Sequence, residues 1–157
     1  MFDWRTQLAT LRDWKAKGRI RYLGVTHYTP SAYAELKSVM QAEALDFIQI
    51  NYSMDDREAE QQILPLAAER RVAVIINRPF GGGGVIRSLQ GRPLPGWAAD
   101  IGCTSWAQVL LKFVLAHPSV TAVIPGTGQV RHMADNVRAG FGEYPDNALR
   151  RRMAAEL

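Results

Sequence analysis

The residues with the clearest chemical potential lie in the stretch 120–136. Residues 120–124 predict a buried parallel strand, and the glycines around Thr127 predict a loop that runs into a helix. A helix start after such a loop presents free backbone N–H groups and the positive end of the helix dipole to an anion. Arg131 and His132 follow on the first turn. We therefore predict a nucleotide phosphate site here, with an ordinary strand-to-helix turn as the alternative.

The rest of the chain alternates strands and helices in the same way. Strands are predicted at residues 19–28, 46–52, 72–76 and 120–124. Helices are predicted at residues 4–17, 32–41, 57–70 (interrupted at Pro65), 85–89, 106–116 and 130–139, and from residue 146 onward. This alternation predicts an α/β fold with a parallel sheet and right-handed crossovers. Four such units fit an open doubly wound sheet or half of an eight-stranded barrel.

Each predicted strand ends in polar or small residues that could contact a ligand. They are Thr26-His27, Gln49 with Asn51, Asn77-Arg78 and Gly126-Thr127. The carboxyl ends of parallel strands meet at one edge of the sheet, where α/β folds keep their sites. We therefore expect a composite site assembled from all four strands.

Composition excludes several classes of protein. The 157 residues are 47% hydrophobic and 22% charged with a net charge of +4, as in one ordinary globular domain. We expect no membrane span and no signal peptide. The single Cys103 excludes an internal disulfide and favours a reducing compartment, the cytoplasm. The arginines at 150–152 are expected on a solvated helix face, because no aromatic-basic motif for reading nucleic acid accompanies them.

Four ordered motifs resemble one enzyme family. Residues 18–28, GRIRYLGVTHY, resemble a strand signature of the aldo-keto reductases, and 47–53 resemble the strand that follows it. Residues 107–118 and 123–136 resemble that family's last helix, strand and helix. The resemblance implies a (βα)8 barrel of which this chain is the C-terminal half, strands five to eight, as a single domain over residues 1–157.

The resemblance also implies a cofactor and the residues that bind it. The family binds NADPH across the C-terminal strand ends, so NADP is expected, with NAD as the alternative. Thr26, His27 and Gln49 match positions that hold the nicotinamide carboxamide, and Asn77 replaces a stacking Tyr or Trp. The remaining matches run toward the adenosine end: Phe80, Gly81 and Gly82 at the pyrophosphate, Gly126 and Thr127 at the adenosine phosphate, His132 in place of an arginine at the 2′-phosphate, and Asp135 and Asn136 near the adenine.

The family's catalytic Asp, Tyr, Lys and His come from the first four strands, which have no counterpart in this match. The resemblance therefore implies the cofactor-binding half of a carbonyl reductase, with no catalytic residue and no turnover on its own. Two alternatives stay open: a non-catalytic nucleotide-binding or regulatory protein, and a structural half-barrel.

Several other residues invite a chemical role, but a plainer one is expected. Tyr28 and Tyr52 are predicted to pack between strand and helix rather than donate a proton. Asp55-Asp56 is predicted to form a helix-capping turn, and residues 81–84 a mobile lid without the spacing of a phosphate-binding fingerprint. The histidines and Cys103 lack the spacing of metal ligands, so no metal site is predicted.

Four strands cannot close a barrel of this kind, and both outer strands would expose unpaired backbone. We therefore predict a homodimer that pairs the two halves edge to edge. A rearranged open sheet, a domain swap and a separate N-terminal partner chain are the alternatives.

Overall fold

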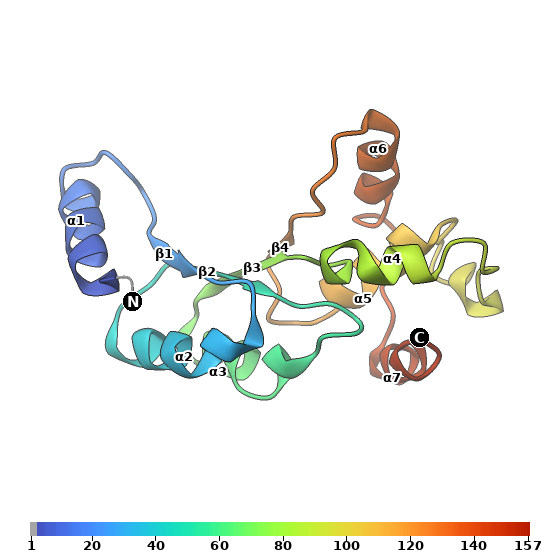
Figure 1. Ribbon diagram of the computed structural model, residues 1–157, viewed down its shortest axis with the longest axis horizontal. Coiled ribbons are helices and arrows are strands. Elements are labelled where there is room, and N and C mark those ends of the chain that lie inside the picture. The colour runs from blue at the N-terminus through green and yellow to red at the C-terminus, as the bar shows by residue number, and fades with distance from the viewer. Residues whose placement is uncertain (1–2) are drawn as a thin grey trace.

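A computed structural model describes residues 3–157, which form one parallel sheet of four strands in the order β1-β2-β3-β4 (Figure 1). The strands are β1 (Gly24–Thr26), β2 (Phe47–Asn51), β3 (Ala73–Asn77) and β4 (Ala122–Val123). The helices are α1 (Trp4–Ala16), α2 (Tyr33–Ala42), α3 (Ile63–Arg70), α4 (Gly84–Ser88), α5 (Trp106–Leu115), α6 (Val130–Arg138) and α7 (Asn147–Ala155). Short 3-10 turns lie at η1 (Pro30–Ala32), η2 (Glu58–Glu60), η3 (Gly81–Gly83) and η4 (Gly96–Ala98). The α/β class and the parallel alternation of strands and helices are confirmed.

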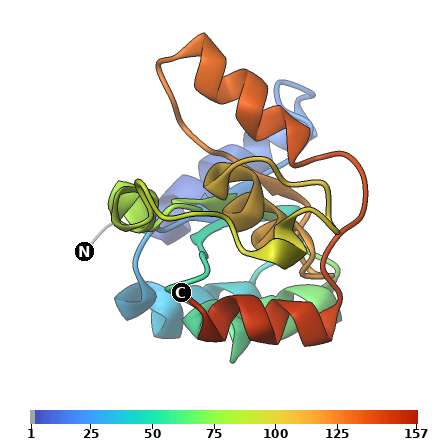
Figure 2. The same ribbon diagram turned by 90° about the vertical axis from the view of Figure 1, so that its right-hand side faces the viewer.

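The core lies on one face of the sheet. Ile48, Ile50, Val74 and Ile76 alternate along β2 and β3 and are all 0% exposed. Figure 1 shows α2 and α3 on that side of the strands, and Figure 2 shows α7 in the same layer. The residues between them in sequence point to the opposite face and are only half-buried. The sheet is therefore covered on one face and largely open on the other.

Capping residues fix the ends of the helices. Asp3 accepts the Thr6 N–H at the start of α1, and Gly18, with φ +68°, follows its end. The Ser105 hydroxyl accepts the Gln108 N–H at the start of α5. Asp146 does the same for the Leu149 N–H of α7. These caps agree with the helix starts and stops that the sequence predicts.

The two edge strands are shorter than predicted. β1 covers three of the residues 19–28, and β4 covers two of the residues 120–124. Each has a neighbouring strand on one side only, so few backbone groups there join a ladder. The predicted helix 57–70 is also split, into η2 and α3. The break precedes Ile63, and Pro65 lies in the first turn of α3, where its missing N–H removes no helical hydrogen bond.

Arg151 and Arg152 are exposed, as predicted for the arginine cluster, but Arg150 is not. Its side chain is 12% exposed, and its Nη2 donates to the Tyr52 hydroxyl (2.5 Å) and to Glu60 (2.9 Å). Tyr52 in turn donates to Glu60, and burial raises the pKa of this phenol well above its usual range. Tyr52 therefore packs in the interior, as predicted, and α7 is anchored to the end of β2. Within residues 3–157, none of the helices is both long and apolar enough to cross a bilayer.

Candidate functional site

The strand register brings the first four predicted site residues together. Thr26 lies opposite Gln49 on the neighbouring strand, and the His27 N–H donates to the Gln49 carbonyl at 2.9 Å. Asn77, at the end of β3, donates its side-chain Nδ2 to the His27 carbonyl at 3.0 Å. These four residues therefore line one edge of the sheet, at the C-terminal ends of β1, β2 and β3.

Asn77 also carries an unused acceptor. Its Oδ1 is buried, and among the described residues no donor reaches it. Leaving such an atom without a partner costs about 1–3 kcal/mol, so a donor from a ligand would be stabilising. A primary amide such as the nicotinamide carboxamide supplies that donor. The chemistry of this edge therefore fits the cofactor end that the family resemblance implies for it.

Tyr28 does not pack in the interior, contrary to the prediction. It is 59% exposed, its ring stacks on the His27 ring at 5.5 Å between centroids, and the Arg78 guanidinium lies 5.6 Å from its centroid. The His27 Nδ1 accepts the Thr29 N–H at 3.2 Å, which fixes the imidazole within the loop after β1. The aromatic pair therefore forms an exposed rim at the end of β1.

A second group of predicted residues surrounds a cavity of about 770 Å³. Three segments that are far apart in the sequence build it: the loop after β3 with α4, the start of α5, and the loop after β4 with α6. The predicted residues on its wall are Phe80, Gly82, Gly126, Thr127, His132, Asp135 and Asn136. Seven of the twelve predicted residues thus meet in one space large enough for a nucleotide.

The wall from α6 is held by hydrogen bonds to α5. The Asp135 carboxylate accepts from the Ser105 hydroxyl at 2.6 Å and from Gln108 Nε2 at 2.5 Å. The Thr127 hydroxyl accepts the Gln129 N–H at 3.2 Å and lies 3.5 Å from His132 Nδ1. Asp135 therefore positions α6, whereas Thr127 and His132, which is exposed, stand at its free N-terminal end.

The twelve predicted residues do not all line the same cavity. Gly81 lines a separate cavity of about 270 Å³ together with Tyr28, Asp55 and Asp56. A Cβ on Gly81 would lie 2.7 Å from Asp55 Oδ2, so this glycine is packed against that carboxylate. Asp55 accepts from Ser53, and Asp56 from Asn51 Nδ2, so this acidic pair anchors the loop rather than capping a helix. The prediction that Asp55-Asp56 forms a helix-capping turn is therefore wrong.

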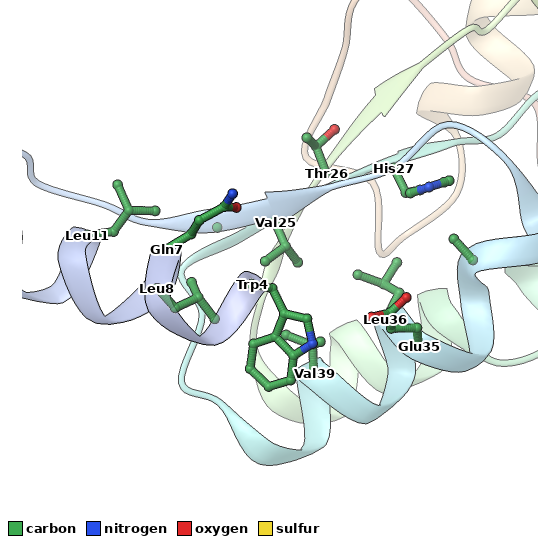
Figure 3. A pocket seen from close by; sticks show the side chains of 12 residues that line it. Trp4, Gln7, Leu8, Leu11, Val25, Thr26, His27, Glu35, Leu36 and Val39 are labelled. Carbon is green, nitrogen blue, oxygen red and sulfur yellow. The ribbon is translucent and has the colours of Figure 1, made fainter. Parts of the chain in front are cut away.

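Thr26 and His27 also border a third cavity, of about 440 Å³, at the free edge of β1 (Figure 3). Figure 3 shows Trp4 and Leu8 of α1 facing Leu36 of α2 across it, with Thr26 on the far side of the strand. Its lining is mainly apolar side chains between helices. This cavity therefore reflects the unpaired edge of the sheet.

Sequence reasoning left out several residues of the large cavity. Arg92, Ser105 and Trp106 line it without having been predicted to contact a ligand, whereas Arg78 was named at a strand end but given no role. Arg92 donates to the Glu156 carbonyl at 2.9 Å, and its guanidinium lies 5.8 Å from the Trp106 ring. The long irregular connection between β3 and α5 carries no periodicity, so its return to the site could not be inferred from pattern.

His117 and Cys103 are half-buried or buried and lie outside the predicted site. Burial lowers the pKa of His117, which packs edge-on against Tyr52. Burial raises the pKa of the Cys103 thiol to about 11. In the part of the chain that the structure describes, no three His, Cys, Asp or Glu side chains are grouped as metal ligands would be.

Comparisons of the whole chain with known proteins give consistent matches. A sequence profile described as the Aldo/keto reductase family matches residues 2–154. Pyridoxine 4-dehydrogenase of Escherichia coli is 27% identical over 132 residues, which are 84% of this chain and 43% of that protein. Methylglyoxal reductase YeaE of the same organism is 26% identical over 136 residues, covering 86% and 48%. The chain spans about half the length of the curated relatives it matches.

Solved structures give the same picture of the fold. An aldo-keto reductase from Klebsiella pneumoniae in complex with NADPH has a TM-score of 0.74 at 21% identity, covering 95% of this chain and 52% of that one. The thermostable aldo-keto reductase Tm1743 has a TM-score of 0.71 at 24% identity, covering 94% and 53%. The four βα units described above therefore have the fold of about half of these molecules.

Proposed function

The chain belongs to the Aldo/keto reductase family, and on that premise we propose that it is the cofactor-binding half of an NADP-dependent carbonyl reductase. One observation carries this proposal: the 770 Å³ cavity gathers seven residues that the family resemblance assigns to the dinucleotide. The Klebsiella pneumoniae relative in complex with NADPH supports the choice of cofactor. NAD is the alternative, because His132 stands where the family places an arginine.

We assign the two ends of the cofactor to the two groups of residues. Thr26, His27, Gln49 and Asn77 would hold the nicotinamide carboxamide, with Asn77 Oδ1 as acceptor. The seven residues on the wall of the large cavity would hold the remainder: Phe80 and Gly82 the pyrophosphate, Gly126 and Thr127 the adenosine phosphate, His132 the 2′-phosphate, and Asp135 and Asn136 the adenine edge. Gly81 lines the small cavity beside Asp55, so it would shape this loop rather than contact the phosphates. When bound, the reduced cofactor supplies a hydride.

The chain by itself should bind the cofactor without reducing a carbonyl, because such a reduction also needs a proton donor. The family's donor comes from strands that have no match in these 157 residues. Among the described tyrosines near the strand ends, Tyr52 is buried against Glu60 and Arg150 with a raised pKa, which opposes proton release. Tyr28 is exposed on the rim, outside the cavity.

We further propose that residues 1–157 are one half-barrel domain and that two copies cover each other's open edges. One cluster of buried hydrophobic residues in the described part of the chain supports the single domain. Beyond β4, apolar side chains are exposed on α6 and the segments next to it: Ile124 (49%), Val130 (87%), Met133 (43%), Val137 (54%) and Phe141 (70%). Figures 1 and 2 show α6 projecting beyond the sheet on the side of β4, while hydrogen bonds from Asp135 tie it to the start of α5. The apolar cavity at β1 marks the other edge. A separate partner chain that supplies the missing strands is the alternative occupant.

Light scattering tests the assembly. The wild-type chain should have twice the mass of one chain, and Val137→Lys should be monomeric, because a charge would then be buried in the interface. Glu69→Lys introduces the same residue at an exposed position on α3, away from both edges, so this control should stay dimeric. A wild-type monomer would contradict the dimer but leave cofactor binding untouched.

The single buried Cys103 agrees with a reducing compartment, and we propose the cytoplasm.

Titration of NADPH fluorescence, followed by an aldehyde reduction assay, tests the function. We expect saturable binding and no NADPH oxidation above background. His132→Ala should weaken NADP⁺ about 10-fold while leaving NAD⁺ unchanged, since one charge-assisted hydrogen bond is lost. Arg138→Ala is the matched control, because Arg138 is exposed in the last turn of α6 and does not line the cavity. Failure of the wild type to bind either dinucleotide would overturn the proposal; robust turnover would overturn the claim that a donor is missing.

A non-catalytic nucleotide-binding role is the second candidate function. Asn77 favours it, because an amide offers no aromatic face for the nicotinamide ring to stack on. If the chain is a non-catalytic binding protein, adding a matching N-terminal half as a separate chain should restore no carbonyl reduction. If the chain is the cofactor-binding half of a reductase, the same addition should restore it.

A further inference from the structure

The backbone at Arg78 is unusual for its position. Arg78 directly follows β3 and has a φ of +51°, in the left-handed region that residues with a Cβ rarely occupy. In the described chain, Arg71 is the only other non-glycine residue with positive φ, and it ends α3, where this conformation is common. Arg78 ends no helix. The conformation instead turns its side chain across the C-terminal edge of the sheet.

The guanidinium of Arg78 lies between two cavities. It borders the large cavity and also the small one that contains Asp55 and Asp56. The Arg78 guanidinium rests over the Tyr28 ring, and a Cβ on Gly82 would lie 2.6 Å from Arg78 Nη2. Glycine at position 82 is thus what allows the arginine to reach along the wall of the large cavity.

The charge on Arg78 has no carboxylate partner within ion-pair distance among residues 3–157, where five other ion pairs occur. Arg92, the other arginine on the cavity wall, is already bonded to the carbonyls of Glu156 and Leu157. Arg78 is also exposed, so its five N–H donors are accessible to a ligand. It is therefore the cation on this wall that is available to an anion.

We propose that Arg78 binds the pyrophosphate of the dinucleotide, as a cofactor-positioning residue beside the loop 80–82. This inference rests on the proposed function. A guanidinium matches phosphate oxygens with two parallel hydrogen bonds. The carboxylates of Asp55 and Asp56 repel an anion from the small cavity, so the phosphates belong on the other side of Arg78, in the large cavity with Thr127. The interaction involves no 2′-phosphate, so it serves NADP and NAD alike.

Calorimetric titration of the full chain with NADP⁺ and with NAD⁺ tests the assignment. Arg78→Gly should weaken both dinucleotides about 10- to 100-fold and leave their ratio unchanged, because a charge-assisted pair of hydrogen bonds to a shared group is lost. Arg78→Lys keeps the positive charge but loses the paired N–H donors of the guanidinium. Its affinity for both dinucleotides should therefore lie between those of the wild type and Arg78→Gly. Glycine accepts the positive φ, so Arg78→Gly should fold, and lysine places no more strain on this backbone than the native arginine.

Arg71→Gly is the matched control, since it changes an arginine with the same backbone conformation far from the cavity. It should leave both affinities unchanged. If Arg78→Gly binds both dinucleotides as tightly as wild type, or loses NADP⁺ alone, the assignment to the pyrophosphate is overturned while the proposed function stands. If the wild type binds neither, the proposed function falls and this inference falls with it.

Discussion

The two faces of the sheet differ although the same alternating strands build both. On the covered face, Ile76 is 0% exposed beneath the helices, while its neighbour Ile75 on the open face is half-buried. The covered face contains only aliphatic side chains in β2 and β3, whereas the open face also contains Gln49 and Asn77. Stability therefore resides on one face, and the proposed chemistry resides at the C-terminal edge of the other.

Truncating the two isoleucines should give the largest difference. Ile76→Ala should lower the free energy of unfolding by about 2–5 kcal/mol, because it removes buried methyl groups and leaves a cavity. Ile75→Ala is the matched control on the same strand and should cost about 1 kcal/mol or less. Urea denaturation measures both. An equally large loss at Ile75 would mean that a second copy packs against the open face of the sheet as well as against its edges.

Gly24 tests whether a half-buried position on the open face tolerates a larger residue. A Cβ at Gly24 would overlap the Phe47 carbonyl oxygen on the neighbouring strand. Gly24→Ala should therefore cost about 1–3 kcal/mol, as overpacked sites do. Gly126→Ala meets nothing within 4 Å and should cost much less. Thermal unfolding of the two variants compares them, and equal melting temperatures would show that β1 shifts freely at its unpaired edge.

Asn77 should affect binding more than stability. Asn77→Ala removes the bond to the His27 carbonyl but also removes the unsatisfied Oδ1, so we expect a change of about 1 kcal/mol or less in the free energy of unfolding. Dinucleotide binding should weaken about 10-fold. Parallel denaturation and fluorescence titration check the two effects. A large loss of stability with unchanged affinity would make Asn77 part of the framework.

The smallest expected effect concerns Asp46, at the start of β2. Its carboxylate accepts from Lys15 at 2.6 Å and from the Leu23 N–H at 2.9 Å, and the bond to Lys15 is the main cause of its lowered pKa. Because the folded pKa lies below the unfolded value of about 3.9, the stabilisation is present above that value and is lost as pH falls through the folded pKa. Both partners are partly exposed, so the effect is modest.

Acid titration monitored by circular dichroism measures this contribution. Asp46→Asn should flatten the fall in stability below about pH 4. Asp13→Asn, which breaks an exposed pair with Lys17, is the control and should leave the curve nearly unchanged. A steeper fall in the Asp46 variant would mean that the carboxylate is not stabilising.

Periodicity was sufficient for the architecture and insufficient for the contacts. The alternation of apolar residues predicts β2 and β3 within one residue, because both strands have partners on each side. It overextends β1 and β4, where the number of paired residues depends on a neighbour that the pattern cannot supply. The exposure of Tyr28 and the burial of Arg150 have the same origin. Both depend on partners 50 and 98 positions away along the chain, Arg78 and Tyr52.

The site was predictable to the extent that it follows strand ends. The register that aligns Thr26 with Gln49 is a direct consequence of parallel pairing. By contrast, the role of Asp135 as the link from α6 to α5 depends on where Ser105 lies after a long irregular loop. The left-handed conformation of Arg78 likewise has no signature in residue type.

The contact between Arg150 and Tyr52 makes the final helix, α7, part of the packed structure around the end of β2. Deleting residues 147–157 would leave the Glu60 carboxylate and the Tyr52 phenol facing an empty groove, next to the strand that lies at the centre of the sheet. Shortened versions of this protein should consequently suffer proteolysis near β2, far from the cut itself. Fusion partners appended after Leu157, which is exposed, should be accepted without that penalty.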